Sequence, residues 1–261
     1  MKFKEIFKSK LKEGDFLWRY LDLHKLIDLA ITGELHFTRT DQFPDPFEGV
    51  TYKLIADRYF AQKSNITNPL IDEAYRIQHN EKNRATLIEY DSESSIKQKT
   101  QFINCWIRSK RESIAMWNLY SNPDSVCLKI KPNDLIDYLR KNIKTQTEFN
   151  PKFQFICGSV KYYRLNPLDP FEKKTLPKYS SFKKDVAYDF EKEFRLLIAT
   201  PTSMSSSNPN FIRLKFSKEF IQLFEIICHP EMENWKFENI KSLCKTFDLQ
   251  APSKSKTEVR I

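Results

Sequence analysis

The stretch FEKEFRLLIA, residues 190–199, is the part of this sequence that most strongly predicts the fold. Its second half, LLIA, is an unbroken apolar run, which is typical of a strand buried on both faces. Its first half is charged. Side chains on a strand alternate between faces, so a strand over 192–199 and its lead-in would point Glu191, Glu193 and Arg195 in one direction. Such a cluster is costly in a buried strand unless its charges are paired.

Further short apolar runs predict additional strands, without a regular alternation of strands and helices. The expected strands cover 16–20, 35–38, 102–107, 125–130, 153–163, 211–216 and 224–229. The expected helices cover 23–31, 112–120, 132–142, a segment ending at Phe190, and 234–247. Asp22 and Gly33 are suitable caps for the first helix. This pattern predicts an α+β protein whose sheet is mixed and mostly antiparallel, with flanking helices.

The chain has 261 residues, which is enough for one domain with a substantial core. We expect a single domain over 1–250 with a polar helical insertion at about 51–100, and a basic flexible tail over 251–261. No apolar run approaches the roughly 20 residues of a membrane span, and the N-terminus has no apolar signal-peptide core. The five cysteines are scattered and odd in number, which favours reduced thiols in a cytoplasmic protein.

The scarcity of glycine excludes several classes of function. Only four glycines occur, and none forms GxGxxG, GxxxxGK[ST] or GxSxG, so Rossmann, P-loop and nucleophile-elbow sites are excluded in their usual form. The four histidines lack the spacing of metal ligands, and we expect no metal site. The net charge of +9 favours an anionic partner.

Three further groups of side chains are candidates for a functional site. Arg19, beside Tyr20 near a strand end, has the fork that clamps a phosphate or a carboxylate. Asp45 lies between two prolines that stiffen its loop. Trp117 and Tyr120 stand three residues apart on a helix and could stack a planar ring. Each group also has a structural interpretation: an ion pair or a stacked arginine, a turn whose aspartate caps local amides, and aromatic core.

Taken in order, the motifs WRY, LHFT, DQFPDPFEG, INCW, MWNLY, SVCLKI, SVKY and FEKEFRLLI resemble those of a bacterial family, the domain of unknown function 2971. The resemblance covers about residues 16–245. Some relatives in that family are similar to abortive-infection or toxin proteins. The layout also resembles, more distantly, the ADP-ribosyltransferase fold.

The second resemblance implies a transferase that uses NAD as its substrate and modifies nucleic acid or protein. By position, Arg19 would hold the pyrophosphate, Thr38 would support the nicotinamide-side ribose, and Glu193 with Glu191 would be the catalytic carboxylates. The rest of the expected NAD-binding set is Tyr20, Asp45, Trp117 and Tyr120. The two resemblances together imply an antiphage toxin in the cytoplasm, with an antitoxin partner and no membrane association.

Two other functions stay open on the sequence alone. A non-catalytic nucleic-acid-binding defence module would have a continuous basic surface with exposed aromatics, and its Glu191 and Glu193 would lie outside any cleft. A metal-dependent nuclease would gather Asp45, Glu48 and Glu193 around Mg²⁺.

Overall fold

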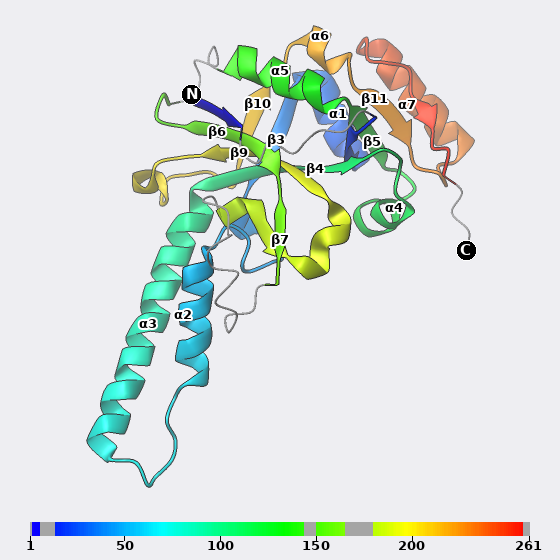
Figure 1. Ribbon diagram of the computed structural model, residues 1–261. Coiled ribbons are helices and arrows are strands. Elements are labelled where there is room, and N and C mark those ends of the chain that lie inside the picture. Colours follow the sequence, from blue (N-terminus) through cyan, green and yellow to red (C-terminus); the bar gives the residue numbers. More distant parts are fainter. Residues whose placement is uncertain (1, 6–13, 144–149, 165–179, 258–261) are drawn as a thin grey trace.

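A mixed sheet forms the centre of the molecule (Figure 1). The computed structural model describes residues 2–5, 14–143, 150–164 and 180–257. Within these residues the main sheet has ten strands. They are β1 (Lys2–Glu5), β2 (Phe16–Leu21), β3 (Glu34–Arg39), β4 (Gln101–Ser109), β5 (Val126–Ile130), β6 (Gln154–Ser159), β9 (Glu193–Ala199), β10 (Phe211–Lys215), β11 (Glu225–Cys228) and β12 (Ser253–Lys254).

The strand order brings distant parts of the chain together. It runs β1-β6-β9-β4-β2-β5-β11-β12, and β3 joins β4 and carries β10. The pairs β1–β6 and β11–β12 are parallel, and the other pairs of the main sheet are antiparallel. The predicted α+β class with a mixed, mostly antiparallel sheet is confirmed.

Four helices cover one face of the sheet over the largest apolar core. They are α1 (Leu23–Thr32), α5 (Pro132–Asn142), α6 (Lys218–Ile221) and α7 (Asn234–Thr246). As the sequence predicts, Asp22 caps α1 by accepting a hydrogen bond from the Lys25 amide, and Gly33 ends it at φ 72°. Alternation along β9 sends Phe194, Leu196 and Ile198 into this core.

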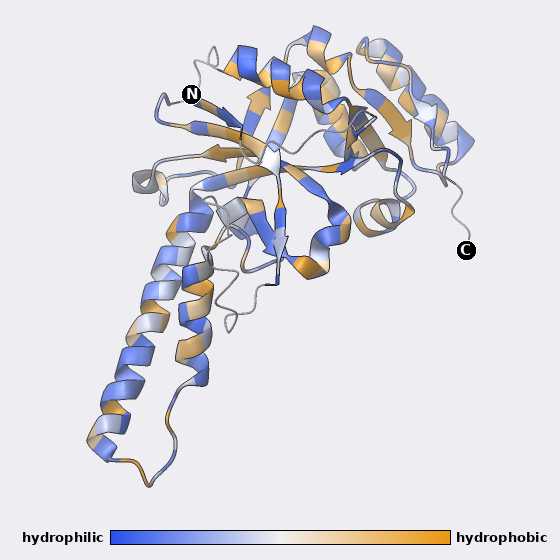
Figure 2. Cartoon of the chain, in the orientation of Figure 1, coloured by the Kyte–Doolittle hydropathy of each residue, from blue (hydrophilic) through white to orange (hydrophobic). Residues whose placement is uncertain are grey.

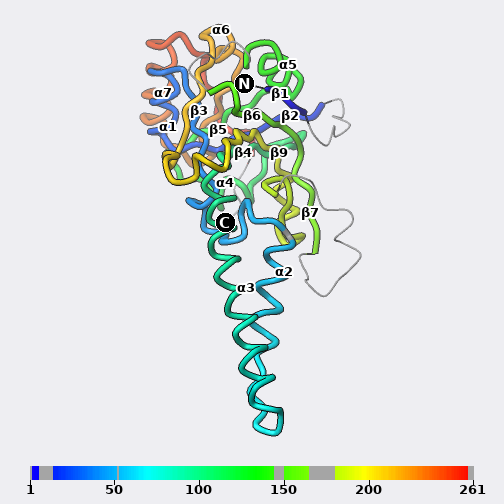
Figure 3. Tube along the Cα trace, turned by 90° about the vertical axis from the view of Figure 1, so that its left-hand side faces the viewer, coloured from blue at the N-terminus to red at the C-terminus, as the bar shows by residue number. Residues whose placement is uncertain are grey.

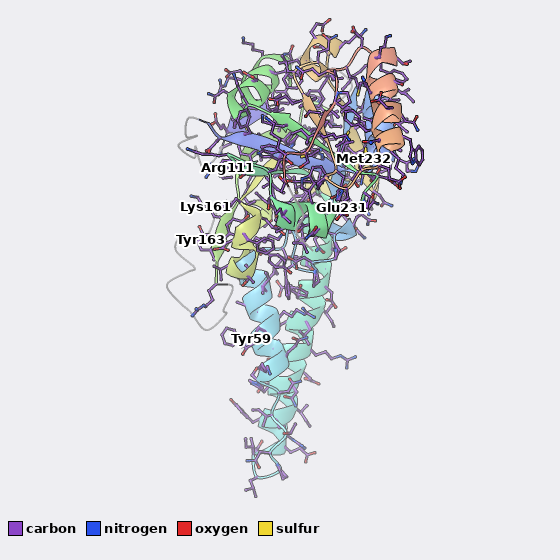
Figure 4. The ribbon with its side chains drawn as sticks, turned by 90° about the vertical axis from the view of Figure 1, so that its right-hand side faces the viewer. Tyr59, Arg111, Lys161, Tyr163, Glu231 and Met232 are labelled. Carbon is purple, nitrogen blue, oxygen red and sulfur yellow. The ribbon has the colours of Figure 1, made fainter. Side chains whose placement is uncertain are left out.

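The opposite face of the sheet is covered by shorter elements and contains the candidate site. These elements are α4 (Ile114–Tyr120), the 3₁₀ turns η1 (Thr40–Gln42), η4 (Ser180–Phe182) and η5 (Val186–Glu191), and a separate parallel pair, β7 (Lys161–Tyr163) and β8 (Lys183–Asp185). Small apolar clusters around Phe182 and Trp117 anchor them to the sheet. Figure 4 labels Lys161 and Tyr163 on β7, which lies on this side of the molecule.

A helical arm extends from the sheet in the stretch 51–100. It consists of α2 (Tyr52–Lys63) and α3 (Glu73–Lys99), which pack side by side and project well beyond the strands (Figures 1 and 3). Figure 2 shows that the arm is mostly hydrophilic, in contrast to the strands. Val50, Leu54, Ile55 and Tyr90 form a small apolar cluster at its base. Within the described residues, no helix combines the length and apolarity that crossing a membrane requires.

Three of the predicted segments have a different structure. The single strand expected over 153–163 is two strands, because the chain leaves the main sheet at Val160 and β7 pairs with β8 instead. The helix expected before Phe190 is the 3₁₀ turn η5. In the tail expected to be flexible, residues 251–257 are described; they add β12 to the edge of β11, and the Ser255 amide donates to the Cys228 carbonyl.

Candidate functional site

A cleft of about 450 Å³ opens on the second face of the sheet. It lies where the loop 43–49, α4 and η5 surround β2, β4 and β9. Its charged and polar lining is Arg19, Tyr20, Lys25, Asp45, Glu48, Cys105, Tyr120, Lys184, Glu191, Glu193 and Arg195. The main aromatic contributors are Trp18, Phe43, Trp106 and Tyr188. Cations, carboxylates and aromatic rings therefore line one small space.

Arg195 organises the floor of the cleft. Its side chain is 1% exposed and makes a bidentate pair with Glu48, with Nη–Oε distances of 2.6 and 2.9 Å. Its Nε donates to Glu193 at 2.6 Å, and Nη1 also donates to the Ser181 carbonyl at 2.6 Å. Because all three charged side chains are buried and mutually paired, the position of Glu193 is fixed.

Lys184 connects the two acidic residues predicted from the sequence. Its ammonium donates to Glu193 at 2.8 Å and also to Glu191. The Tyr120 hydroxyl, at the end of α4, donates to the other oxygen of Glu191. The Tyr188 ring stacks over the Lys184 ammonium at 4.4 Å. Glu191 and Glu193 are therefore held together by one shared cation.

The surroundings of the two carboxylates shift their pKa values in opposite directions. Burial and the neighbouring Glu193 raise the pKa of Glu191 to about 7. Burial alone would also raise the pKa of Glu193, but the positive charge and hydrogen bonds of Arg195, together with the charge of Lys184, hold it well below its usual range. These surroundings therefore favour an ionised Glu193 and a Glu191 that can exchange a proton near neutral pH.

A sharp backbone turn lets both carboxylates reach this cluster. Strand alternation was expected to point them in the same direction, but β9 begins only at Glu193, and Glu191 is the last residue of η5. Between them Lys192 has φ 44°, in the left-handed region that non-glycine residues seldom occupy. The alternation prediction is correct for Glu193 and Arg195, whereas Glu191 reaches the cleft through this turn.

Arg19 enters the cleft through an opening in the sheet. β4 pairs with β3 at Phe102 and Ile103 and with β2 at Ile107–Ser109, so β4 has no ladder partner on that side between these segments. At this opening the Arg19 guanidinium donates from Nη1 to the Cys105 carbonyl at 2.7 Å. In the sheet order, β4 lies between β2, which carries Arg19, and β9, which carries Glu193.

The Arg19 guanidinium has hydrogen-bonding capacity that the protein does not use. Its Nε is buried and has no acceptor within the described part of the chain. Among those residues Arg19 forms no salt bridge. Burial lowers the pKa of its side chain. Arginine keeps its charge even so. A half-buried cation with a spare donor, in the lining of a cleft, is suited to an anionic ligand.

The loop 43–49 is fixed by contacts at both ends. Asp45 accepts a hydrogen bond from the Phe47 amide at 2.8 Å, which is the turn-capping role weighed for it, and it also lines the cleft. Gln98, near the end of α3, donates to the Pro46 and Glu48 carbonyls, both at 3.0 Å. The base of the arm therefore supports the loop that carries Glu48, the partner of Arg195.

Two members of the expected NAD-binding set lie elsewhere. Thr38 pairs with Ile103 on β4, whereas the part of that strand that lines the cleft is residues 105–107. Trp117 is fully buried, with its ring edge-to-face against Tyr20 at 4.7 Å and its Nε1 donating to Glu112. The face of α4 that carries Trp117 packs on the sheet, and only Tyr120 extends to the cleft. Neither Thr38 nor Trp117 therefore lines this cleft.

Sequence reasoning missed Lys184 and Tyr188. Lys184 belongs to a basic stretch that resembles solvated surface, and its role depends on Glu191 and Glu193, which follow it on η5 and β9. The arrangement also bears on the alternatives. Both glutamates lie in a cleft, contrary to the expectation for a non-catalytic module. In the described residues no three His, Cys, Asp or Glu side chains gather as metal ligands would.

Comparisons with known proteins add little. Neither models of known protein families nor curated protein sequences give a significant match. Among solved structures, DarT of Thermus sp. 2.9 in complex with ADP-ribosylated ssDNA is similar at 11% sequence identity and a TM-score of 0.35, over 98% of this chain and 97% of that chain. Similarity at this level establishes neither a common fold nor a common function.

Proposed function

We propose that this cleft binds NAD and that the protein transfers the ADP-ribosyl group to nucleic acid or protein. One observation carries the proposal: the buried Nε–H of Arg19, which has no acceptor among the described residues, belongs to a cleft that also holds two carboxylates whose pKa values shift in opposite directions. A spare donor on a cation suits an anionic group. A fixed carboxylate suits a reaction that develops positive charge. NAD offers both, in its diphosphate and in its nicotinamide–ribose bond.

The dimensions and lining of the cleft fit such a ligand. A volume of about 450 Å³ falls within the range of roughly 300–1,000 Å³ found for small-molecule sites. Arg19 would bind the diphosphate, and the aromatic rings along the walls, Tyr20 and Tyr120 among them, would contact the planar bases. Asp45, on the loop 43–49, can accept a hydrogen bond from a ribose hydroxyl.

The proposed reaction exchanges one bond for another at C1′ of the ribose. The bond to the nicotinamide nitrogen breaks, and nicotinamide leaves as a neutral molecule with both electrons. The acceptor, an oxygen or nitrogen of the target, supplies the electron pair of the new bond and loses a proton. Between these events the ribose resembles an oxocarbenium ion, as in glycoside hydrolysis.

The two glutamates divide the work of this reaction. Glu193, held ionised by Arg195 and Lys184, supplies negative charge close to the developing cation. Glu191, whose pKa is about 7, takes the proton that the acceptor loses. Tyr120 and Lys184 orient Glu191 for that transfer. In a cell, such a reaction on nucleic acid or protein would make the chain a toxin, held in check by an antitoxin.

The test is to incubate the purified chain with NAD labelled in its adenylate half and with cell extract, and to measure label in protein, in nucleic acid and in free ADP-ribose. We expect transfer by the wild type. Glu193→Gln should reduce it by about 10²–10³-fold, because the shape stays and the charge is removed. Arg19→Ala should also reduce transfer, because it removes the cation proposed to bind the diphosphate. Arg140→Ala, a surface change on α5, is its matched control and should retain full transfer.

Two results would contradict the proposal. Wild-type protein that places no label in protein or nucleic acid lacks the proposed transferase activity, whether or not free ADP-ribose forms. Equal transfer by the wild type and by a folded Glu193→Gln variant would remove Glu193 from the reaction.

A further inference from the structure

The arm carries a stripe of side chains that its own packing does not use. α3 faces α2 and the arm's base with Asn83, Tyr90 and Ser94, which are buried. On a different side of α3, Ile77 is 50% exposed and Ile88 is 63% exposed. They are eleven residues apart, about three turns, so they lie on one face of the helix.

Two exposed charged residues complete this stripe. Glu81 and Arg84 lie between the isoleucines, and the spacing of 4, 3 and 4 residues is that of a coiled-coil seam. In the described residues, ion pairs of the arm join Lys53 to Asp57 and Arg76 to Glu73. Neither Glu81 nor Arg84 forms an ion pair with another described residue. We call Ile77, Glu81, Arg84 and Ile88 the α3 stripe.

The α3 stripe is complementary to itself in the antiparallel direction. Read from either end, it is apolar, charged, charged and apolar, and the two charges are opposite. An antiparallel copy would set Ile77 against Ile88 of the second copy, and Glu81 against Arg84 of the second copy. The two-fold axis repeats both contacts, as in an isologous dimer. A parallel copy in register would instead oppose like charges.

We propose that two copies of this chain associate through the α3 stripe, with their α3 helices antiparallel. The arm is accessible for this contact, since it stands clear of the rest of the molecule from three directions (Figures 1, 3 and 4). The partner is a second copy of this chain, because Glu81 and Arg84 of one α3 stripe pair with Arg84 and Glu81 of another. A single-helix contact is a small interface, so the dimer is weak and depends on concentration. The proposal is independent of the cleft's chemistry.

Sedimentation velocity over a concentration series tests the contact. We expect the wild type to shift from monomer towards dimer as its concentration rises. Glu81→Arg and Arg84→Glu should each weaken association by about tenfold or more, because each change opposes like charges twice. The double variant Glu81→Arg/Arg84→Glu should restore it. Glu89→Arg, an exposed change on α3 outside the stripe, is the control and should leave association unchanged.

Cysteine cross-linking tests the direction of the pairing. A mixture of Ile77→Cys and Ile88→Cys proteins should form a disulfide-linked dimer. Neither variant alone should do so, since like positions lie about 16 Å apart along antiparallel helices. The proposal is overturned if the wild type stays monomeric at the highest concentration tested, if the double variant fails to restore association, or if Ile77→Cys cross-links to itself.

Discussion

Glu191 and Glu193 are separated by one residue, yet their side chains have different electrostatic environments. Glu193 faces the buried guanidinium of Arg195, which keeps it ionised. Glu191 is buried with a shared lysine and a tyrosine hydroxyl, and its pKa rises from an ordinary 4.5 to about 7. Opposite pKa shifts in neighbouring groups are typical of sites that need both a fixed charge and a proton carrier.

The raised pKa of Glu191 predicts opposite pH dependences for activity and stability. Transfer should increase as pH rises through about 7, because Glu191 accepts a proton only when ionised. The folded chain binds that proton more tightly than the unfolded chain does. This contribution to stability is therefore full below about pH 4.5 and is lost as pH rises to about 7. Rate profiles and urea unfolding across this range measure both effects.

Glu191→Gln is the control for the pH experiment. It should remove the rise in rate near pH 7 and flatten the stability profile over the same range. Glu193 contributes with the opposite sign, since its lowered pKa adds stability that is lost only as pH falls below about 4.5. A wild-type rate that does not change between pH 6 and pH 8 would contradict the assignment of Glu191 as proton acceptor.

At the scale of elements, the loop 43–49 positions Glu48 and depends on Gly49. Gly49 has φ 76°, and a Cβ placed there would lie 2.5 Å from Oγ1 of Thr40. The Gly49 carbonyl accepts hydrogen bonds from Gln101 and Ser180, so the backbone cannot shift freely to avoid the clash. This position therefore tolerates only glycine, for both conformational and steric reasons.

Gly49→Ala should destabilise the protein by about 2–4 kcal/mol, from the positive φ and the steric overlap together. Gly14→Ala is the matched control, because Gly14 has φ 84° but nothing within 4 Å of its would-be Cβ. It should cost only about 1 kcal/mol. Urea unfolding of both variants gives the difference. Equal losses in the two variants would show that contact with Thr40 is unimportant.

Sequence patterns predicted the elements well where a local signal exists. The caps of α1 and the apolar run of β9 are local, and the structure has both. The left-handed Lys192 was not predictable, because lysine seldom adopts this conformation and only the surrounding contacts enforce it. The spacing of Trp117 and Tyr120 predicted that both would stack on one ligand ring. In the structure Trp117 is buried in the core, whereas Tyr120 is exposed and its hydroxyl donates to Glu191.

At the scale of the whole molecule, the site arises from contacts between segments far apart in sequence. Glu48 and Arg195 are 147 positions apart, and Tyr120 and Glu191 are 71 positions apart. A single sequence carries the residue types for such pairs but not the pairing itself. Arg19, Asp45 and the glutamates could therefore be named as candidates in advance. Arg195 was also expected beside the glutamates from strand alternation. The shared partner Lys184, the pairing of Arg195 with Glu48 and the opening in the sheet at Arg19 required the three-dimensional structure.

The central claim is that Arg19 binds the diphosphate of NAD in this cleft. Its most direct test is calorimetric titration of NAD into the Glu193→Gln chain, which should bind without turnover, and into the same chain with Arg19→Ala added. We predict saturable binding to the first and affinity about 10–100-fold weaker in the second, the loss expected for a charged hydrogen-bonding group. Equal affinity in the two proteins, or no saturable binding of NAD to either protein or to the wild type, would contradict the account.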